Sequence, residues 1–465
     1  MDQLSGLDAV FLSMETPSSP AHMGGMTLLD PSGGRGFSFE RLRREICERL
    51  PSCPRFTRKL QEVPLGLDLP YWVEDPSFDV DRHLRRIALP APGGTEELNE
   101  LVGWIFSQPL DRDHPLWEIW LIEGLAGGRS ATLMKLHHCL MDGVSGAGLA
   151  ELLCDPEPEP RSPRALGPAG PTRSATPPGP LQMALRAAQN AAARPAALLR
   201  HAGRLGRAAL GALLEAQALP FAADAPRLPF NTRVGRRRAI AFSSVSLEAV
   251  QEVRRHFGVT VNDVLLALSG SALRQYLEER GQLPAEPLVA IVPVSTRSQG
   301  DLAPGNQITE ATVCWATDRA DPVERLLCIH ASSARSTRAV RRNGSNLLGM
   351  LGESLPPGLV QLAAQLSSHA VERIPLPGNA VVSTVRATPF PLYMSGARVE
   401  CMVPLSVLAP SQGLNITAVS YCGRVDFGFI VDPDRVPQHQ RIADGIGPAL
   451  EELQAATREH LHRAA

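Results

Sequence analysis

Two consecutive histidines close to an aspartate-glycine pair are the residues of this chain best suited to chemistry. His137 and His138 end an apolar run, and Asp142 and Gly143 follow after a short gap. This pattern predicts a strand, a tight loop and a helix. Because successive side chains of a strand point to opposite faces, only one of the two imidazoles can face a given cavity. With an unperturbed pKa of about 6.5, that imidazole could accept a proton from a hydroxyl or thiol at neutral pH.

The residues after the histidines shape the loop. Asp142 could hold the tautomer of the imidazole, or it could fix the loop through a basic partner elsewhere in the chain. Gly143 indicates a backbone conformation or a close approach that a side chain would obstruct. Ser145 follows in the run Gly-Val-Ser-Gly, which lacks the G-x-S-x-G spacing of a serine hydrolase. The loop therefore does not favour a serine nucleophile.

Composition and charge argue against several other classes of function. The chain has 465 residues, of which 44% are hydrophobic and 20% charged, as in a globular protein of two or three domains. Its formal net charge of −2 gives no general attraction to nucleic acid. The eight cysteines form no C-x-x-C pair and the histidines have no cluster of partners, so we expect no metal site. No Walker or dinucleotide glycine loop occurs, and we expect no bound cofactor.

The sequence carries no secretion signal and no span long enough to cross a bilayer. The first residues lack a basic start and an apolar block. No segment approaches the roughly 18 continuous apolar residues of a transmembrane helix. We therefore expect a cytoplasmic protein whose contact with the inner face of the cell membrane or with lipid bodies is peripheral.

A change of composition divides the chain into two α/β parts with mixed sheets. Residues 1–154 form the first part, which contains the histidine motif. Residues 155–228 begin with a stretch rich in proline, glycine, serine and arginine that predicts a linker. Residues 229–465 form the second part.

The periodicity predicts individual elements in both parts. In the first part, apolar spacing indicates helices at Phe39–Leu50 and Glu96–Phe106. In the second part, a strand followed by a helix is predicted within Phe242–Phe257. Two alternating runs around Cys422-Gly423-Arg424 predict a hairpin. Asn262 opens a further helix there, where an amide or a neighbouring acid can cap free N–H groups.

The segment that follows the linker predicts a basic amphipathic helix. Over residues 196–219, arginines gather on one helical face and leucines on the other. Such a helix can lie on a lipid surface. It can also pack on its own protein with the arginines in solvent, and we favour this second interpretation.

The motif His137-His138-x-x-x-Asp142-Gly143 resembles the HHxxxDG signature of acyltransferases with the chloramphenicol-acetyltransferase-like fold. Further stretches resemble one branch of that superfamily, the bacterial wax ester synthase/diacylglycerol acyltransferases, and they occur in the same order over nearly the whole chain. These stretches are Leu4–Leu12, Pro115–Trp117, Asn262–Asp263, Pro293–Arg297 and Ser420–Gly423.

The resemblance implies a fold and a reaction. It implies two chloramphenicol-acetyltransferase-like domains joined by a crossover, with a tunnel at their interface that reaches the histidine motif. It also implies transfer of a long acyl chain from acyl-CoA, as co-substrate, to diacylglycerol or to a long-chain alcohol, at a peripheral membrane or lipid-body surface. The products would be triacylglycerol and wax ester.

The resemblance further assigns roles to the motif residues. His138 would be the general base that removes the hydroxyl proton of the acceptor and then protonates the departing sulfur of CoA. His137, Asp142 and Gly143 would shape the loop. Asn262 would polarise the thioester carbonyl or place the acceptor, although a capping role fits it equally well.

One stretch departs from the family pattern. Where the family usually has Ser-Asn-Val-Pro-Gly-Pro, this chain has Ser-Thr-Val-Arg-Ala-Thr at residues 383–388. A turn built on proline and glycine is thereby lost. The change leaves open one alternative, a lipid-binding or lipid-body protein with reduced turnover. A second alternative does not depend on this stretch: a related acyltransferase could use the same histidine and take its acyl group from a carrier protein.

Overall fold

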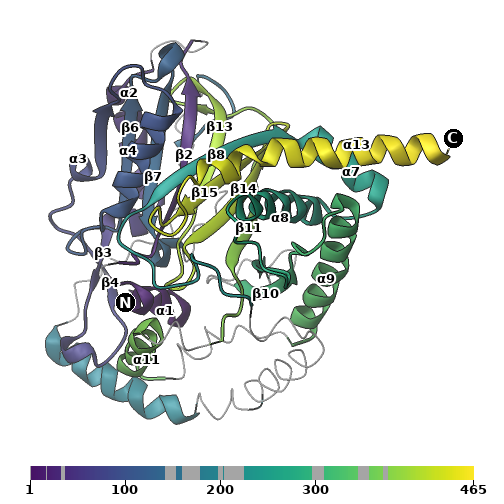
Figure 1. The fold of residues 1–465 in the computed structure, drawn as a ribbon. Coiled ribbons are helices and arrows are strands. Elements are labelled where there is room, and N and C mark those ends of the chain that lie inside the picture. The colour runs from purple at the N-terminus through teal and green to yellow at the C-terminus, as the bar shows by residue number, and fades with distance from the viewer. Residues whose placement is uncertain are drawn as a thin grey trace.

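The computed structural model is a mixed α/β structure with two six-stranded sheets and a small third sheet (Figure 1). It describes residues 2–16, 18–32, 37–141, 153–159, 179–196, 203, 225–295, 308–343, 355–369 and 375–464. The fold class predicted from the sequence is confirmed. Asp142 and Gly143 lie outside these residues, as do Ser145 and nearly all of the predicted amphipathic helix at 196–219.

The first sheet contains the strand that leads into the histidine pair. Its order is β12-β13-β2-β7-β6-β5. These strands are β2 (His22–Asp30), β5 (Leu84–Ala88), β6 (Trp117–Glu123), β7 (Ser130–His137), β12 (Tyr393–Met394) and β13 (Ala397–Leu405). Strand β7 is buried at every position, which accounts for its apolar sequence. Because β12 and β13 come from the second half of the chain, the two halves are joined by a crossover of strands.

The second sheet has the order β10-β9-β11-β14-β15-β8, and β11 is parallel to both of its neighbours. Its strands are β8 (Ala239–Ser246), β9 (Val289–Ser295), β10 (Ile308–Cys314), β11 (Ala380–Arg386), β14 (Leu414–Tyr421) and β15 (Arg424–Val431). The predicted hairpin is confirmed, with Tyr421 paired to Arg424. Its two turn residues, Cys422 and Gly423, have φ of 43° and 81°. Such positive values suit the right-handed twist of a two-residue hairpin.

The third sheet pairs the N-terminus with a loop region of the first half, in the order β1-β4-β3. Its strands are β1 (Asp2–Gln3), β3 (Arg58–Gln61) and β4 (Tyr71–Glu74), and the short helices of this half are α3 (Val80–His83), η1 (Leu50–Ser52), η2 (Pro54–Thr57), η3 (Pro64–Gly66), η4 (Ala126–Gly128) and η5 (His138–Met141). Residues 180–196 form a helix that packs against this sheet, where buried Met183 contacts Val63, Tyr71 and Val73.

Further helices of the first half are α1 (Gly6–Met14), α2 (Phe39–Arg49) and α4 (Thr95–Ser107), and those of the second half are α7 (Leu247–Phe257), α8 (Val261–Glu279), α9 (Pro322–Asn343), α11 (Pro357–His369), α12 (Gln440–Asp444) and α13 (Ile446–Ala464). Most of them lie beside the two large sheets, whereas α11 lies beside α1 (Figure 1). The helices predicted at Phe39–Leu50 and Glu96–Phe106 are confirmed as α2 and α4. The predicted strand and helix within Phe242–Phe257 are confirmed as β8 and α7.

The two halves share a core. Ile240 of β8 and Ile430 of β15 belong to the same buried cluster as Val102 and Ile105 of α4. The approach of the sheets is close enough to require glycine, since a Cβ on Gly428 would lie 1.8 Å from the carbonyl oxygen of Pro404. The halves are therefore fixed against each other along a packed interface.

Candidate active site

The histidine pair lies where β7 ends and η5 begins. The N–H of His137 donates to the carbonyl of Leu116 at 3.0 Å, and the N–H of His138 donates to the carbonyl of Ala21 at 2.9 Å. His137 is the last residue of the strand and pairs with His22 of β2. The two imidazoles enter different surroundings, as the alternation of strand side chains predicts.

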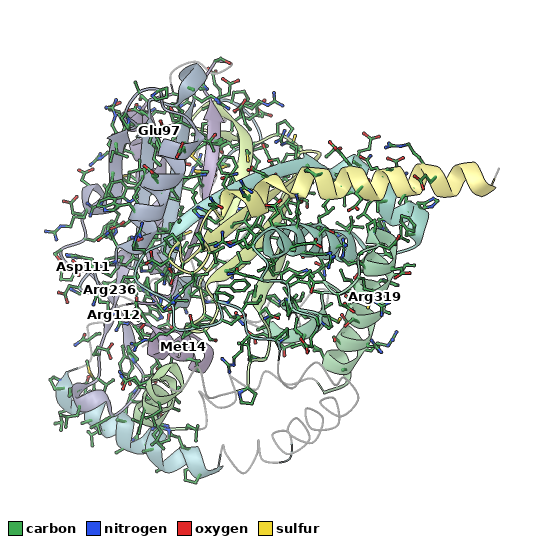
Figure 2. All side chains as sticks on the ribbon, viewed as in Figure 1. Met14, Glu97, Asp111, Arg112, Arg236 and Arg319 are labelled. Atoms are coloured by element: carbon green, nitrogen blue, oxygen red, sulfur yellow. The ribbon has the colours of Figure 1, made fainter. Side chains whose placement is uncertain are left out.

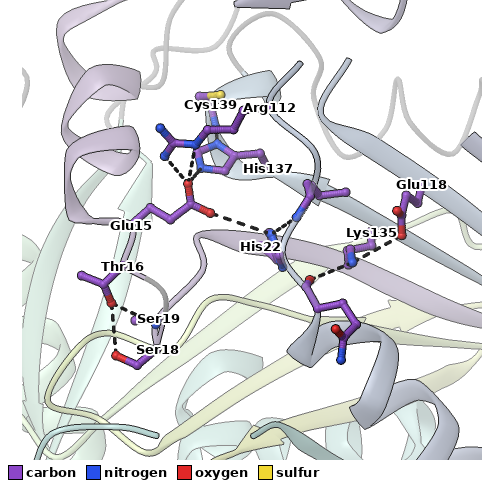
Figure 3. Close-up of polar contacts among 12 residues, drawn as sticks. Glu15, Thr16, Ser18, Ser19, His22, Arg112, Glu118, Lys135, His137 and Cys139 are labelled. Carbon is purple, nitrogen blue, oxygen red and sulfur yellow. Dashed lines mark hydrogen bonds and ion pairs between the residues drawn. The ribbon is translucent and has the colours of Figure 1, made fainter. Parts of the chain in front are cut away.

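His137 is buried, with one ring nitrogen hydrogen-bonded and the other close to a carboxylate. Its Nδ1 accepts a hydrogen bond from the N–H of Cys139 at 3.1 Å, which leaves the ring proton on Nε2. Nε2 lies 3.6 Å from a carboxylate oxygen of Glu15, just after α1 (Figure 3). The His137 ring is therefore part of the packed interior.

Glu15 connects His137 to Arg112, whose Nε donates to the same carboxylate at 3.1 Å and whose Nη2 also contacts it. Burial of Glu15 tends to raise its pKa, but its contacts with His137 and Arg112 outweigh burial and lower that pKa to about 2. Glu15 is therefore ionised at neutral pH. It provides the negative charge beside the histidine pair.

A buried lysine fixes the segment that carries Arg112. Lys135 of β7 donates from Nζ to the carbonyls of Ile105 and Gln108, each at 3.0 Å, and lies 3.3 Å from Glu118 (Figure 3). A cation at the carboxyl end of α4 interacts favourably with the free carbonyls there. The N–H of Leu110 then donates to His22 at 3.3 Å. Residues 107–112 are thus held against β2 and β7.

His138 has an apolar neighbour where His137 has ionic ones. Its ring is partly exposed and stacks on Phe11 of α1 with centroids 3.6 Å apart and planes inclined by 19°. Burial, followed by the nearby His137, lowers the pKa of His138 to about 4. The imidazole is therefore neutral at pH 7. Its Nδ1 is buried, so Nε2 is the nitrogen that can meet a ligand.

A cavity of about 1610 Å³ opens between the two halves beside this site. Its walls are α4, residues 107–112, the start of β8 with the arginines before it, and α12. Glu15 and Arg112 line it, and they link it to His137. His138 is not among the lining residues that the structure describes.

Asn262 is the second residue of α8 and does not cap it. The cap is formed by Thr260 and Asp263, which exchange hydrogen bonds in a capping box. Capping, the alternative role for Asn262, is therefore carried out by its neighbours Thr260 and Asp263. The Oδ1 of Asn262 instead accepts a hydrogen bond from the hydroxyl of Thr384 on β11 at 3.0 Å. Its Nδ2 has no hydrogen-bond partner among the described side chains.

The altered stretch at residues 383–388 continues β11 as extended chain. Ala387 donates its N–H to the carbonyl of Ser420 at 3.0 Å, and Cys422 donates to the carbonyl of Thr388 at 3.1 Å. Both contacts use groups that glycine and proline would also offer at positions 387 and 388, so the change of residues does not by itself create this pairing. Thr384 is the residue of this stretch that contacts a predicted site residue.

Sequence reasoning did not find the partners of the histidine pair. Glu15, Arg112 and Phe11 lie far from the motif in the chain, and no local pattern connects them to it. The one available signal was Lys135, a lysine inside an apolar run in a chain with only one other, Lys59. A charged residue in a buried strand indicates a fixed partner.

Within the described ranges, no group of three or more His, Cys, Asp or Glu side chains is placed to hold a metal ion. None of the helices that the structure describes has the length and apolar character needed to cross a membrane.

The chain was then compared with known proteins. Residues 4–265 match the wax ester synthase/diacylglycerol acyltransferase catalytic domain, and residues 304–454 match the C-terminal domain of the same family. A protein of Mycobacterium tuberculosis strain H37Rv named as a diacylglycerol O-acyltransferase is 37% identical over 97% of this chain and 90% of its own length. One of strain CDC 1551, also named as a diacylglycerol O-acyltransferase, is 36% identical over 98% of this chain and 99% of its own.

Solved structures agree with the sequence comparison. The wax ester synthase/diacylglycerol acyltransferase of Marinobacter aquaeolei VT8 matches with a TM-score of 0.69 and 28% identity, covering 98% of this chain and 99% of that one. The first condensation domain of the CDA synthetase matches with a TM-score of 0.57 at 15% identity, over 97% of this chain and 95% of that one, and shows the shared fold alone. The chain therefore belongs to the wax ester synthase/diacylglycerol acyltransferase family and is an acyltransferase.

Proposed function

We propose that this acyltransferase moves a long acyl chain from acyl-CoA to diacylglycerol, and also to long-chain alcohols, with His138 as the general base. The observation that carries the proposal is the neutral imidazole of His138, held flat by Phe11 and partly exposed. The names of the relatives support diacylglycerol as the acceptor. In the proposed reaction acyl-CoA is a co-substrate, and no bound cofactor takes part.

The reaction balances with one proton carried by His138. Nε2 accepts the hydroxyl proton of the acceptor while the hydroxyl oxygen bonds to the thioester carbonyl carbon. The carbon–sulfur bond then breaks, and the imidazolium returns the proton to the sulfur. The products are an ester and free CoA, without an acyl-enzyme.

Asn262 is suited to the negative charge that develops on the carbonyl oxygen. Because its Oδ1 is occupied by Thr384, its Nδ2 is the atom left to donate a hydrogen bond. Among the remaining motif residues, His137 positions the loop through Cys139 and Glu15. Asp142 and Gly143, which lie outside the described residues, keep the loop-shaping roles that the family resemblance implies.

A direct assay tests this proposal. Purified protein is supplied with long-chain acyl-CoA and diacylglycerol, and free CoA and triacylglycerol are both measured. His138→Ala should lower kcat by about 10²- to 10⁴-fold, the usual contribution of a general base. The matched control is His256→Ala on α7, which should retain activity. Equal turnover in wild type and His138→Ala would overturn the proposed role.

The same assay separates the two alternatives. A lipid-binding protein with reduced turnover would release no CoA from the wild type. An enzyme that requires a carrier protein would transfer the acyl group from acylated carrier and not from acyl-CoA. Formation of equal amounts of CoA and triacylglycerol supports the proposal over both.

We also propose that the chain works at a membrane or lipid-body surface. Leu359, Leu362 and Leu366 lie on one face of α11 and are 49% to 61% exposed. Within α11 and the helix at 180–196 there is no aspartate or glutamate. Helix α11 packs beside α1, which carries the Phe11 that stacks on His138 (Figure 1). An apolar face without acidic residues next to the site suits a lipid acceptor.

Sedimentation with vesicles tests the surface. Replacing the three leucines of α11 by serine should weaken partition onto anionic vesicles, and Leu327→Ser on α9 should not, although Leu327 is also exposed. Deletion of residues 196–219 should weaken partition if that helix also lies on lipid. Unchanged partition in the deletion variant would favour the interpretation that the helix packs on the protein.

A further inference from the structure

The large cavity between the two halves has an arginine wall. Arg236, Arg237 and Arg238 precede β8 and line the cavity, and Arg112 lines it from the 107–112 segment. Figure 2 shows Arg112 and Arg236 on the side of the first sheet, away from Arg319. The arginine cavity, as we call it, ends inward at Glu15, which contacts His137.

The arginines that line this cavity make different contacts. Arg238 is buried, and its guanidinium donates to the carbonyls of Gly235 at 2.7 Å and of Ser18 at 2.8 Å. Its N–H donates to the hydroxyl of Ser107 at the end of α4, at 2.8 Å. Burial lowers the pKa of Arg238 to about 10, so it stays charged at neutral pH. Arg238 therefore fixes the position of the run and is not free to bind a ligand.

Arg236 differs from Arg238 in its surroundings. Its side chain is exposed at the cavity, and it makes no ion pair with any residue that the structure describes. Arg237 pairs with Asp434 at 2.9 Å, but both side chains are largely exposed, so this pair is weak and can be exchanged for a better anion. A fixed backbone that presents a free guanidinium is suited to bind phosphate.

The wall of the cavity that α4 forms carries an exposed aromatic side chain and two carboxylates that repel anions. Trp104 of α4 lines the cavity and is 54% exposed. Exposed indole is suited to stack on a purine base. Glu96 and Glu100 lie on the same helix and also line the cavity, so an anionic group is directed to the arginine wall.

Among acyl donors, CoA combines a purine, a 3′-phosphate, a pyrophosphate and a long neutral arm that ends in the thioester. We propose that the arginine cavity binds the nucleotide end of the donor, with Arg236 on its phosphates and Trp104 on its adenine. The neutral arm then runs inward past Arg112 and Glu15 toward the histidine pair. This inference rests on acyl-CoA being the donor, as in the proposed function.

The test compares three ligands of decreasing length at the nucleotide end. Dissociation constants of CoA, 4′-phosphopantetheine and pantetheine are measured by calorimetry on the full chain, wild type and variants. Arg236→Ala should weaken CoA by about tenfold, the effect of one charge-assisted hydrogen bond. It should leave pantetheine unchanged, because pantetheine has no phosphate. Arg236→Lys should restore part of the affinity for CoA.

A second variant tests the adenine. Trp104→Ala should weaken CoA by about tenfold and leave 4′-phosphopantetheine unchanged, whereas Trp104→Phe should retain most of the affinity. Arg319→Ala is the control, since Arg319 is a half-exposed arginine next to Asp318 in the loop between β10 and α9, away from the cavity (Figure 2). An Arg236→Ala variant that binds CoA as tightly as wild type would overturn the inference, and so would equal loss for all three ligands.

Because the assay measures binding and not turnover, its failure differs from failure of the proposed function. If CoA binding depends on Arg236 but no acyl transfer occurs, the nucleotide site in the arginine cavity is supported and the proposed acyltransferase function is contradicted. If acyl transfer from CoA occurs but CoA binding does not depend on Arg236 or Trp104, the nucleotide site is contradicted and the proposed function is supported. Inorganic phosphate is included as a competitor, and displacement of CoA by phosphate as readily as by ADP would also count against a nucleotide site.

Discussion

The two sides of the histidine pair differ sharply in chemistry, although the two residues are adjacent and identical. On the His137 side, Glu15 and Arg112 form an ionic link that continues to the arginine cavity. On the His138 side, the ring stacks on Phe11, and α1 packs beside α11 with its exposed leucines. The end of β7 separates the two environments within one peptide unit.

This difference matches the two substrates that the proposed reaction must bring together. Acyl-CoA is anionic at one end and soluble, whereas diacylglycerol is apolar and resides in lipid. A polar route on one side and an apolar surface on the other would allow both to reach one imidazole.

The largest effect should come from pH, through the buried neutral histidines. Burial lowers the pKa of His22 to about 3 and that of His138 to about 4. A histidine with a lower pKa in the folded state binds its proton in the unfolded state, so stability falls as the pH drops below about 6.5. Each histidine should cost about 2 kcal/mol of the free energy of unfolding between pH 7 and pH 5.

Urea unfolding at pH 7 and pH 5 measures this loss. Over the same range Glu15 stays ionised in both states apart from a small part near pH 5, because its folded pKa is about 2 and its contribution is lost only below its ordinary value of 4.5. His22→Gln should reduce the pH-dependent loss by about 2 kcal/mol, the share of one histidine. Stability that does not change between pH 7 and pH 5 would contradict the neutral state of these rings.

Loss of the ionic side should be next in size. Glu15→Ala leaves the buried Nε2 of His137 without its carboxylate neighbour and releases half-exposed Arg112, which should lower the free energy of unfolding by about 2 to 3 kcal/mol. Urea unfolding at pH 7 measures it. Glu278→Ala, which removes an exposed carboxylate on α8, serves as control and should stay within about 0.5 kcal/mol of wild type. Equal stability of the two variants would show that the contacts of Glu15 with His137 and Arg112 do not stabilise the fold.

Loss of the apolar side should have a smaller effect on stability and a distinct one on the pKa. Phe11→Ala should cost about 2 kcal/mol, less than for a fully buried phenylalanine. By opening His138 to water it should also move the pKa of that ring upward toward 6.5. NMR titration of the ring in Phe11→Ala and Phe11→Leu measures the shift. No movement in Phe11→Ala would mean that other residues keep the ring dry.

The smallest effect concerns the altered stretch at residues 383–388. Thr384→Val removes the hydrogen bond to Asn262 and should lower kcat about threefold, with unfolding unchanged. Thr384→Ser retains the hydroxyl and should retain the rate. If Thr384→Val turns over as fast as wild type, the orientation of Asn262 does not depend on this contact.

Local signals in the sequence were enough for the elements that carry the site. The apolar run before His137 marked β7, and the turn at Cys422 and Gly423 marked the hairpin, because both depend on side-chain alternation and on turn geometry close in the chain. The family resemblance, carried by motifs in a fixed order, was confirmed. The placement of β12 and β13 in the first sheet had no local signal, since register between distant strands is set by packing.

The surroundings of the histidines were out of reach for a related reason. Glu15 and Arg112 are separated by 97 residues, and only the packing of α1 against the 107–112 segment brings them together. The cap of α8 was assigned too loosely, because Thr260 and Asp263 compete with Asn262 for the same N–H groups. Spacing identifies candidate residues, and tertiary contacts decide which of them is free to act.

The pH dependence of kcat/KM for acyl-CoA, measured with diacylglycerol between pH 4 and pH 8, tests the central claim most directly. This profile reports the pKa of the essential base in the free enzyme, and tryptophan fluorescence in the same samples reports whether the chain remains folded. With His138 as the base, the rate of the folded enzyme should stay level from pH 8 downward and fall toward pH 4. A loss of rate centred near pH 6.5 in folded enzyme would contradict a His138 whose pKa the fold holds well below its ordinary value.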